Sequence, residues 1–143
     1  MNCLDSTFLI DFLDGGRPRH ERARRWMTEH EAEPMYAPTV VRWEVLRGAA
    51  RLDGTDGVER LSAELTWLEP LPLTAAAADE AARIEAELRA RGDEISAADY
   101  PIAGTARNAG ATLVTADPDF ERVDGLDVER YDWPFMDRTT RHD

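Results

Sequence analysis

A chain of 143 residues is long enough to bury a hydrophobic core within one domain. Its composition, 43% hydrophobic and 32% charged, is typical of a globular protein and excludes a disordered or membrane-embedded chain. The formal net charge of −12 disfavours unaided binding to nucleic acid, because phosphate affinity depends mainly on cationic contacts.

The cellular compartment is predicted from the N-terminus and the cysteine content. The opening Met1-Asn2-Cys3-Leu4-Asp5 carries a charge within five residues and lacks the basic lead-in of a secretory signal. Cys3 is the only cysteine and lies in a strand-like run, so we expect a buried, inert thiol. These features predict a cytoplasmic protein with no membrane association.

The first half of the chain is predicted to alternate strands and helices. Residues 2–4 form a short strand, Asp5-Ser6 caps a brief helix, and a polar helix covers 19–30. Residues 35–37 form a second strand, and the next helix opens at Pro38-Thr39. The apolar stripe of that helix consists of Val41, Val45, Gly48 and Leu52.

After a turn at 53–57, apolar spacing predicts a further helix from Val58 through Leu68. A short edge strand is expected where Leu71 and Leu73 flank Pro72. Residues 75–91 form the clearest helix, ended by Gly92.

A capping box of Ser96 and Asp99 predicts the start of a helix that ends at Gly110. Strands at 112–115 and 126–128 complete the pattern. Short strands that alternate with helices predict an α/β fold with a mainly parallel sheet. We expect one domain over residues 1–132 and a tail over 133–143.

Four acidic residues fall where a parallel α/β sheet binds ligands, beyond the carboxyl ends of its strands. Asp5 and Asp117 follow predicted strands, and Asp99 lies in the first turn of a helix. Glu44 lies about 60° from the axis of its helix's apolar stripe. A glutamate beside a buried seam is costly unless it is paired or binds a metal.

Each acid also has a structural explanation. Asp5, Asp99 and Asp117 would each cap a helix, and Glu44 would pair with Arg42 or Arg47. These explanations leave the joint pattern unaccounted for, because carboxylates gathered at one rim raise one another's pKa unless cations are bound. Oxygen ligands suit Mg²⁺ or Mn²⁺ rather than zinc.

The ordered motifs resemble PIN domains of the VapC toxin type. Residues 4–11 resemble the first motif, 43–48 the second, 98–106 the third and 112–120 the fourth. The match runs from Met1 to about Val128. One departure is Pro101, which falls early in the helix after Asp99 and leaves open where that helix starts.

This resemblance implies a PIN-like fold with a five-stranded, mainly parallel sheet flanked by helices on both faces. It implies metal-dependent endonucleolytic cleavage of RNA with Mg²⁺ or Mn²⁺, and as partners an antitoxin and a second copy of the chain. The metal-binding acids carried over are Asp5, Glu44, Asp99 and Asp117. Asp119 would assist them, and Ser6 and Thr115 would support them as hydrogen-bond donors.

A basic run could guide the RNA backbone. Its members are Arg17, Arg19, Arg22, Arg24 and Arg25. The alternative is a solvated helix face that Glu21 and Glu29 partly neutralise.

Three other functions are weighed against the toxin nuclease. One is a catalytically silent PIN-like module that only binds a partner, against which the four intact acids argue. Another is a PIN nuclease of RNA maturation. A Mg²⁺-dependent phosphatase is disfavoured, because Asp5 is followed by Ser6-Thr7 instead of completing an Asp-x-Asp motif.

Overall fold

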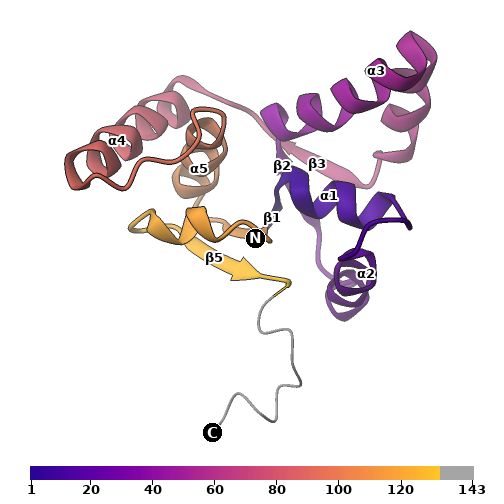
Figure 1. The fold of residues 1–143 in the computed structure, drawn as a ribbon, viewed down its shortest axis with the longest axis horizontal. Coiled ribbons are helices and arrows are strands. Elements are labelled where there is room, and N and C mark those ends of the chain that lie inside the picture. Colours follow the sequence, from indigo (N-terminus) through magenta and orange to yellow (C-terminus); the bar gives the residue numbers. More distant parts are fainter. Residues whose placement is uncertain (133–143) are drawn as a thin grey trace, which may run out of the picture.

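The computed structural model describes residues 1–132, and the predicted tail at 133–143 lies outside the described residues. Five strands form one sheet in the order β3-β2-β1-β4-β5, and every neighbouring pair is parallel (Figure 1). The strands are β1 (Asn2–Leu4), β2 (Met35–Pro38), β3 (Leu68–Leu71), β4 (Thr112–Thr115) and β5 (Asp127–Arg130). The predicted α/β fold with a parallel five-stranded sheet is confirmed.

Helices cover both faces of this sheet, with α1 and α2 on one side and α4 and α5 on the other (Figure 1). The helices are α1 (Ser6–Leu13), α2 (His20–Glu29), α3 (Thr39–Glu64), α4 (Ala75–Arg91), α5 (Asp99–Ala109) and the short 3-10 helix η1 (Pro118–Arg122). None of the helices in residues 1–132 is long and apolar enough to cross a bilayer.

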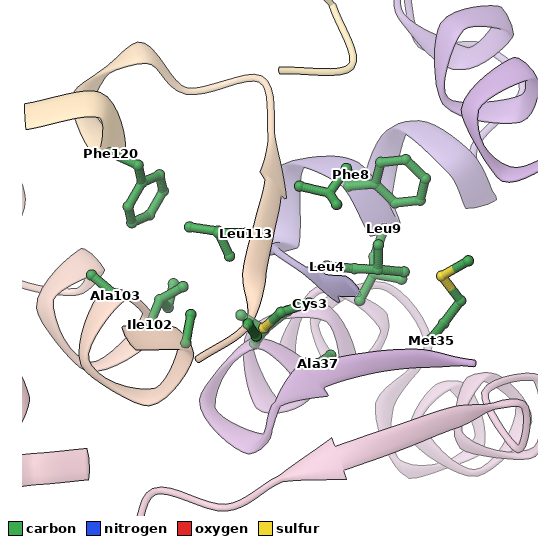
Figure 2. Packing of buried hydrophobic residues seen from close by; sticks show 14 of the residues in the cluster. Cys3, Leu4, Phe8, Leu9, Met35, Ala37, Ile102, Ala103, Leu113 and Phe120 are labelled. Carbon is green, nitrogen blue, oxygen red and sulfur yellow. The ribbon is translucent and has the colours of Figure 1, made fainter. Parts of the chain in front are cut away.

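The core lies on both sides of β1 and β4, because successive side chains of a strand point to opposite faces. Cys3 pairs with Leu113, and both lie toward Ile102 of α5 (Figure 2). Leu4 lies on the other side with Phe8 of α1 (Figure 2). Cys3 is fully buried, and this burial raises the pKa of its thiol to about 12. The predicted buried thiol is confirmed.

The predicted apolar stripe of α3 is correct only in its first turns. Val41 and Val45 are buried, but Gly48 is exposed and Leu52 is 85% exposed. The far part of α3 extends past the sheet (Figure 1), and nothing lies within 4 Å of a Cβ at Gly48. The predicted turn at 53–57 is a kink inside α3, where Gly54 has a φ of 63°.

The predicted helix from Val58 and the following edge strand have wrong boundaries. α3 ends at Glu64, and a turn at Leu65 leads directly into β3 at Leu68. Leu65 is buried in this turn and Leu68 is buried in β3. Their separation of three residues resembles the spacing of apolar residues on a helix. β3 is an edge strand as expected, and an edge position tolerates Pro70.

The predicted capping box at Ser96 is also wrong. α5 starts at Asp99, and its N-cap, Ala98, provides no side-chain cap. Pro101 is therefore the third helical residue, where its missing N–H has no intrahelical partner to lose. The predicted stops at Gly92 and Gly110 are confirmed, with φ values of 72° and 65°.

Candidate active site

The carboxyl ends of β1 and β4 meet where the strand order changes direction. The chain proceeds from β1 to β2 and β3 on one side and places β4 and β5 on the other. Asp5 directly follows β1, and its backbone N–H donates to the Val114 carbonyl of β4 over 3.3 Å. Asp117 follows β4 at the same edge. Open α/β sheets bind ligands at this kind of switch point.

Asp5 is a buried carboxylate with defined hydrogen bonds. Its Oδ1 accepts from the Thr7 hydroxyl over 2.8 Å and from the Phe8 backbone N–H over 2.9 Å, which caps α1. Its Oδ2 accepts from the Thr115 hydroxyl. Burial raises the pKa of Asp5 to about 6, and the charge of Asp117 adds to the rise, although the three donors oppose it.

Thr115 connects Asp5 to the acids that follow β4. Its hydroxyl oxygen accepts from the Asp117 backbone N–H over 3.0 Å while the same hydroxyl donates to Asp5. Asp117 Oδ1 in turn accepts from the Asp119 backbone N–H over 2.9 Å and caps η1. This chain of contacts fixes the position of Asp117 relative to Asp5.

Glu44 lies on the second turn of α3 and points part of its carboxylate into the protein. Oε1 is buried and has no hydrogen-bond partner among the described residues. Desolvation by burial raises the pKa of Glu44, whereas the neighbouring Ser6 side chain and the Arg47 charge lower it. Of the two predicted arginine partners, Arg47 lies near the carboxylate, and Arg42 instead donates to the Ser62 hydroxyl over 2.9 Å.

Among the described acids, Asp99 is the one whose pKa is affected by the largest number of other acidic side chains. Burial is the largest cause that raises its pKa to about 6. The negative charges of Asp117, Glu44, Asp5 and Asp119 raise it further, in that order. All five predicted acids therefore lie near enough to interact at one edge of the sheet, although they come from four separate parts of the chain.

A divalent cation fits this group of side chains. No three acidic, histidine or cysteine side chains within residues 1–132 already stand together as a ready metal-binding group. The available donors are nevertheless all oxygens, which Mg²⁺ and Mn²⁺ prefer. A buried Glu44 Oε1 without a partner is costly, and a bound cation would offset that cost. It would also relieve the repulsion that raises the pKa of Asp99.

Sequence reasoning missed two polar residues of α1, of which Thr7 contacts the site and Asp11 is buried beside it in the same helix. Thr7 donates to Asp5 and lies 3.5 Å from the Ala116 backbone N–H, to which its hydroxyl is the acceptor. One turn further along α1, Asp11 is fully buried, and its Oδ2 accepts from the Tyr131 hydroxyl over 2.6 Å. The sequence gives no signal for this burial, because polar side chains at positions i and i+4 of a helix ordinarily indicate its solvated face.

Two of the predicted RNA-contact arginines are bound to this buried aspartate. Arg17 Nε lies 3.4 Å from Asp11 Oδ1, and Arg19 Nε lies 2.8 Å from Oδ2. The Asp11 and Tyr131 contacts raise the pKa of Arg19, although burial opposes this rise. Both arginines therefore stabilise the loop between α1 and α2.

The other three arginines lie on α2 and differ in their partners. Arg22 donates to the Asp132 carbonyl over 3.3 Å, and Arg24 forms an ion pair with Glu21 over 3.2 Å. Arg25 makes no hydrogen bond or ion pair to another residue within 1–132. The structure thus places the basic run around α2, with its members engaged to different degrees.

Comparisons with known proteins agree with this geometry. The family model for the PIN domain matches residues 3–126, so the chain belongs to the PIN domain family. DNA-bound VapBC from Salmonella typhimurium is similar, with 25% identity, a TM-score of 0.78, and coverage of 91% of this chain and 97% of that one. FitAcB from Neisseria gonorrhoeae has 25% identity and a TM-score of 0.79, and the match covers 92% of this chain and 98% of that one.

A third similar structure is VapC20 from Mycobacterium tuberculosis, described as a sarcin-ricin loop cleaving toxin. Its identity is 21% and its TM-score 0.65, with coverage of 85% of this chain and 94% of that one, so it supports the fold alone. No curated protein matches the chain. The resemblance to VapC-type PIN domains, drawn from four short motifs, is confirmed for the family and the fold.

Proposed function

We propose that this protein is a Mg²⁺- or Mn²⁺-dependent endoribonuclease and the toxin of a toxin–antitoxin pair. PIN domains are nucleases, which gives the class of reaction. The observation that supports the proposal is the position of Asp5 and Asp117 beyond the carboxyl ends of the adjacent strands β1 and β4, where the Thr115 hydroxyl links the Asp5 carboxylate to the Asp117 backbone. RNA as the substrate and an antitoxin as the partner are supported by the VapC-type neighbours.

Each residue of the proposed site has a role in this function. Asp5, Glu44, Asp99 and Asp117 would hold the cation, with Asp119 as an assisting carboxylate. A bound Mg²⁺ or Mn²⁺ would neutralise charge on the scissile phosphate and lower the pKa of a water for in-line attack. Asp5 Oδ1 already accepts two hydrogen bonds, whereas Oδ2 accepts one and can accept another or bind a cation. Thr115 and Thr7 thereby orient the carboxylate, and Ser6 supports Glu44.

The proposal is tested by incubating total cellular RNA with purified protein and Mn²⁺ or Mg²⁺. Asp5→Asn and Asp99→Asn remove charge with little change of shape, and EDTA removes the metal. Metal-dependent cleavage that both variants lose supports the nuclease, and water as the nucleophile predicts products with 5′-phosphate ends. A folded, antitoxin-free wild type that leaves RNA intact favours the silent binding module.

Expression in living cells distinguishes a toxin from an RNA-maturation nuclease. Induced expression of a toxin arrests growth, and co-expression of the product of a small neighbouring gene restores it. A maturation nuclease shows neither effect. A cytoplasmic location, predicted from the N-terminus and Cys3, is part of the same proposal, because the protein must reach its RNA substrate there.

An open groove offers a place for the antitoxin. It has a volume of about 400 Å³, and its apolar floor is made by Phe12, Met27, Met35 and Trp67. Glu31 and Glu33 line the same groove, so it fits a segment that brings apolar side chains together with a cation. Met27→Glu would add a third carboxylate to this groove, and loss of co-purification with the antitoxin is the expected result.

A second copy of the chain is the other partner in this proposal. It is carried by the resemblance to VapC-type toxins, and light scattering after size exclusion measures it directly. A mass of twice the chain supports a homodimer, and the mass of one chain at micromolar concentration contradicts it.

A further inference from the structure

One tryptophan and two arginines form a line along the exposed surface of α3. Trp43, Arg47 and Arg51 are spaced four residues apart, so they lie on the same side of the helix. The Trp43 side chain is 58% exposed, and Arg47 and Arg51 are exposed as well. The Arg47 guanidinium carbon lies 5.1 Å from the centroid of the Trp43 ring, which is a cation–π contact. We call these three residues the α3 strip.

The two arginines of the α3 strip form no hydrogen bond or ion pair within residues 1–132. Twelve other arginines within residues 1–132 form a hydrogen bond or ion pair there. Only Arg25, Arg47 and Arg51 make neither contact with another described residue. In a chain of net charge −12, two such cations on one helix face are therefore a local exception.

The α3 strip begins at the acidic site. Trp43 directly precedes Glu44 on α3, and Arg47 follows Glu44 by three residues, which is about one helical turn. Arg47 thus contacts the Trp43 ring and lies about one helical turn from Glu44 of the proposed active site.

We propose that single-stranded RNA enters the active site over the α3 strip, with one base stacked on Trp43 and phosphates bound by Arg47 and Arg51. This inference rests on the proposed ribonuclease function. An exposed indole accepts any base, because every base has a π-face. Stacking requires a base that is not already paired and stacked in a duplex, so the α3 strip selects single-stranded segments. A polyanion needs cations beside an acidic centre, and Arg47 and Arg51 provide them there.

The test measures RNA binding without cleavage. Full-length protein in EDTA is titrated into a fluorescently labelled, unstructured RNA oligonucleotide, and anisotropy reports the dissociation constant. Trp43→Ala is expected to weaken binding by about 5- to 150-fold, the loss of one stacked base, while Trp43→Phe retains most of the affinity. Replacing Arg47 and Arg51 together by alanine is expected to reduce the slope of log K against log salt by about 1.4.

The matched control is Arg83→Ala. It removes one exposed positive charge from α4 and leaves the α3 strip intact, so RNA affinity is expected to stay at the wild-type value. Affinity that falls in Arg83→Ala by half or more of the loss, in log K, seen in the double arginine variant contradicts the proposal, because it shows an effect of net charge alone.

Separate readouts distinguish the strip from the nuclease function. Wild-type RNA affinity in Trp43→Ala overturns the proposal, and a simultaneous change of oligomeric mass would assign Trp43 to an interface between two copies of the chain. If wild type cleaves RNA with Mn²⁺ and the strip variants do so with unchanged kcat/KM, the α3 strip fails while the nuclease stands. If wild type binds RNA through Trp43 but cleaves none, the nuclease fails while the RNA-binding strip stands.

Discussion

The Thr115 hydroxyl donates a hydrogen bond to Asp5 Oδ2 across a separation of 110 residues in the chain. Thr115 ends β4 and Asp5 follows β1, so the contact spans the two strands at which the sheet changes direction. Because both residues are almost fully buried, water cannot replace this donor if it is lost. The position of the carboxylate therefore depends on a threonine from the far end of the domain.

Thr115→Val removes this donor and keeps the branched shape of the side chain. We expect the free energy of unfolding to fall by about 1–3 kcal/mol, because a buried acceptor loses a partner. RNA cleavage should fall as well, since Asp5 loses a fixed orientation. Urea unfolding and cleavage rates measure the two effects. Thr115→Ser keeps the hydroxyl and should behave like wild type, and equal behaviour of the valine and serine variants would contradict the role of the donor.

The buried Asp5 predicts a pH dependence of stability in metal-free protein. Its pKa is about 6 in the fold against an ordinary value of 3.8, so the folded state favours the protonated form. The resulting stabilisation is fully present below pH 3.8 and is lost as the pH rises through 6. A difference of about two pKa units corresponds to about 3 kcal/mol.

Asp5→Asn removes this contribution, because the amide does not titrate, and it also removes the Asp5 charge that raises the pKa of Asp99. In EDTA, the stability of Asp5→Asn relative to wild type should rise between pH 4 and pH 7 by up to about 3 kcal/mol. Glu80, whose pKa Arg107 lowers, has the opposite pH dependence but is present in both proteins and cancels. A difference in urea stability that stays constant across this range would contradict the raised pKa.

Glu44→Gln separates metal binding from folding. At pH 7 the metal-free variant should be at least as stable as wild type, because it no longer buries part of a carboxylate whose pKa is raised. Saturating Mn²⁺ at about 100 times its dissociation constant should stabilise wild type by about 2.7 kcal/mol, and Glu44→Gln should lose much of this gain. Thermal unfolding with and without Mn²⁺ measures both. Glu85→Gln, an exposed change on α4, is the control and should keep the full Mn²⁺ effect.

The placement of Asp5 and Asp117 could be predicted because it follows from strand geometry alone. Parallel strands end at the same edge of a sheet, so acids that follow two such strands must lie close together. Glu44 could be placed beside a buried seam from its angle to Val41 and Val45, but its unpartnered oxygen depends on which side chains surround it. That packing is a property of the tertiary structure and leaves no periodic signal.

The sequence predictions were wrong where a helical pattern gives no information about what packs against the helix. The spacing of Val41, Val45 and Leu52 is regular, yet Leu52 is exposed because the sheet ends before the helix does. The buried Asp11 was missed for a related reason. An aspartate on an amphipathic helix is ordinarily solvated, and only the fold brings Tyr131 and two arginines to it.

The close approach of α4 and α5 predicts a strong effect of Gly104→Ala. A Cβ at this position would lie 2.6 Å from the Ala81 nitrogen and 2.7 Å from the Ala77 carbonyl oxygen, both of which belong to the α4 backbone. Separating the helices should cost about 1–3 kcal/mol. It should also displace Asp99 at the start of α5 and slow RNA cleavage.

Gly48→Ala on α3 is the matched control for Gly104→Ala. Nothing lies within 4 Å of a Cβ there, so we expect a stabilisation of about 0.5–1 kcal/mol from helix propensity alone. Urea unfolding of the two variants shows directly whether each substitution raises or lowers the free energy of unfolding. A loss of stability at Gly48 as large as that at Gly104 would show that the close helix contact is not the cause.

Arg19→Ala tests whether the basic run serves the fold or the RNA. Its guanidinium lies 2.8 Å from the buried Asp11 carboxylate, with Arg17 as a weaker second partner at 3.4 Å. Because the Arg19 side chain is 37% exposed, solvent screening limits the expected loss of stability to about 1–2 kcal/mol. Arg25→Ala, which breaks no ion pair with a described residue, should change stability by no more than about 0.5 kcal/mol. Urea unfolding together with RNA affinity in EDTA decides between the two roles, because an Arg19→Ala protein of wild-type stability and weakened RNA binding would assign this arginine to the substrate.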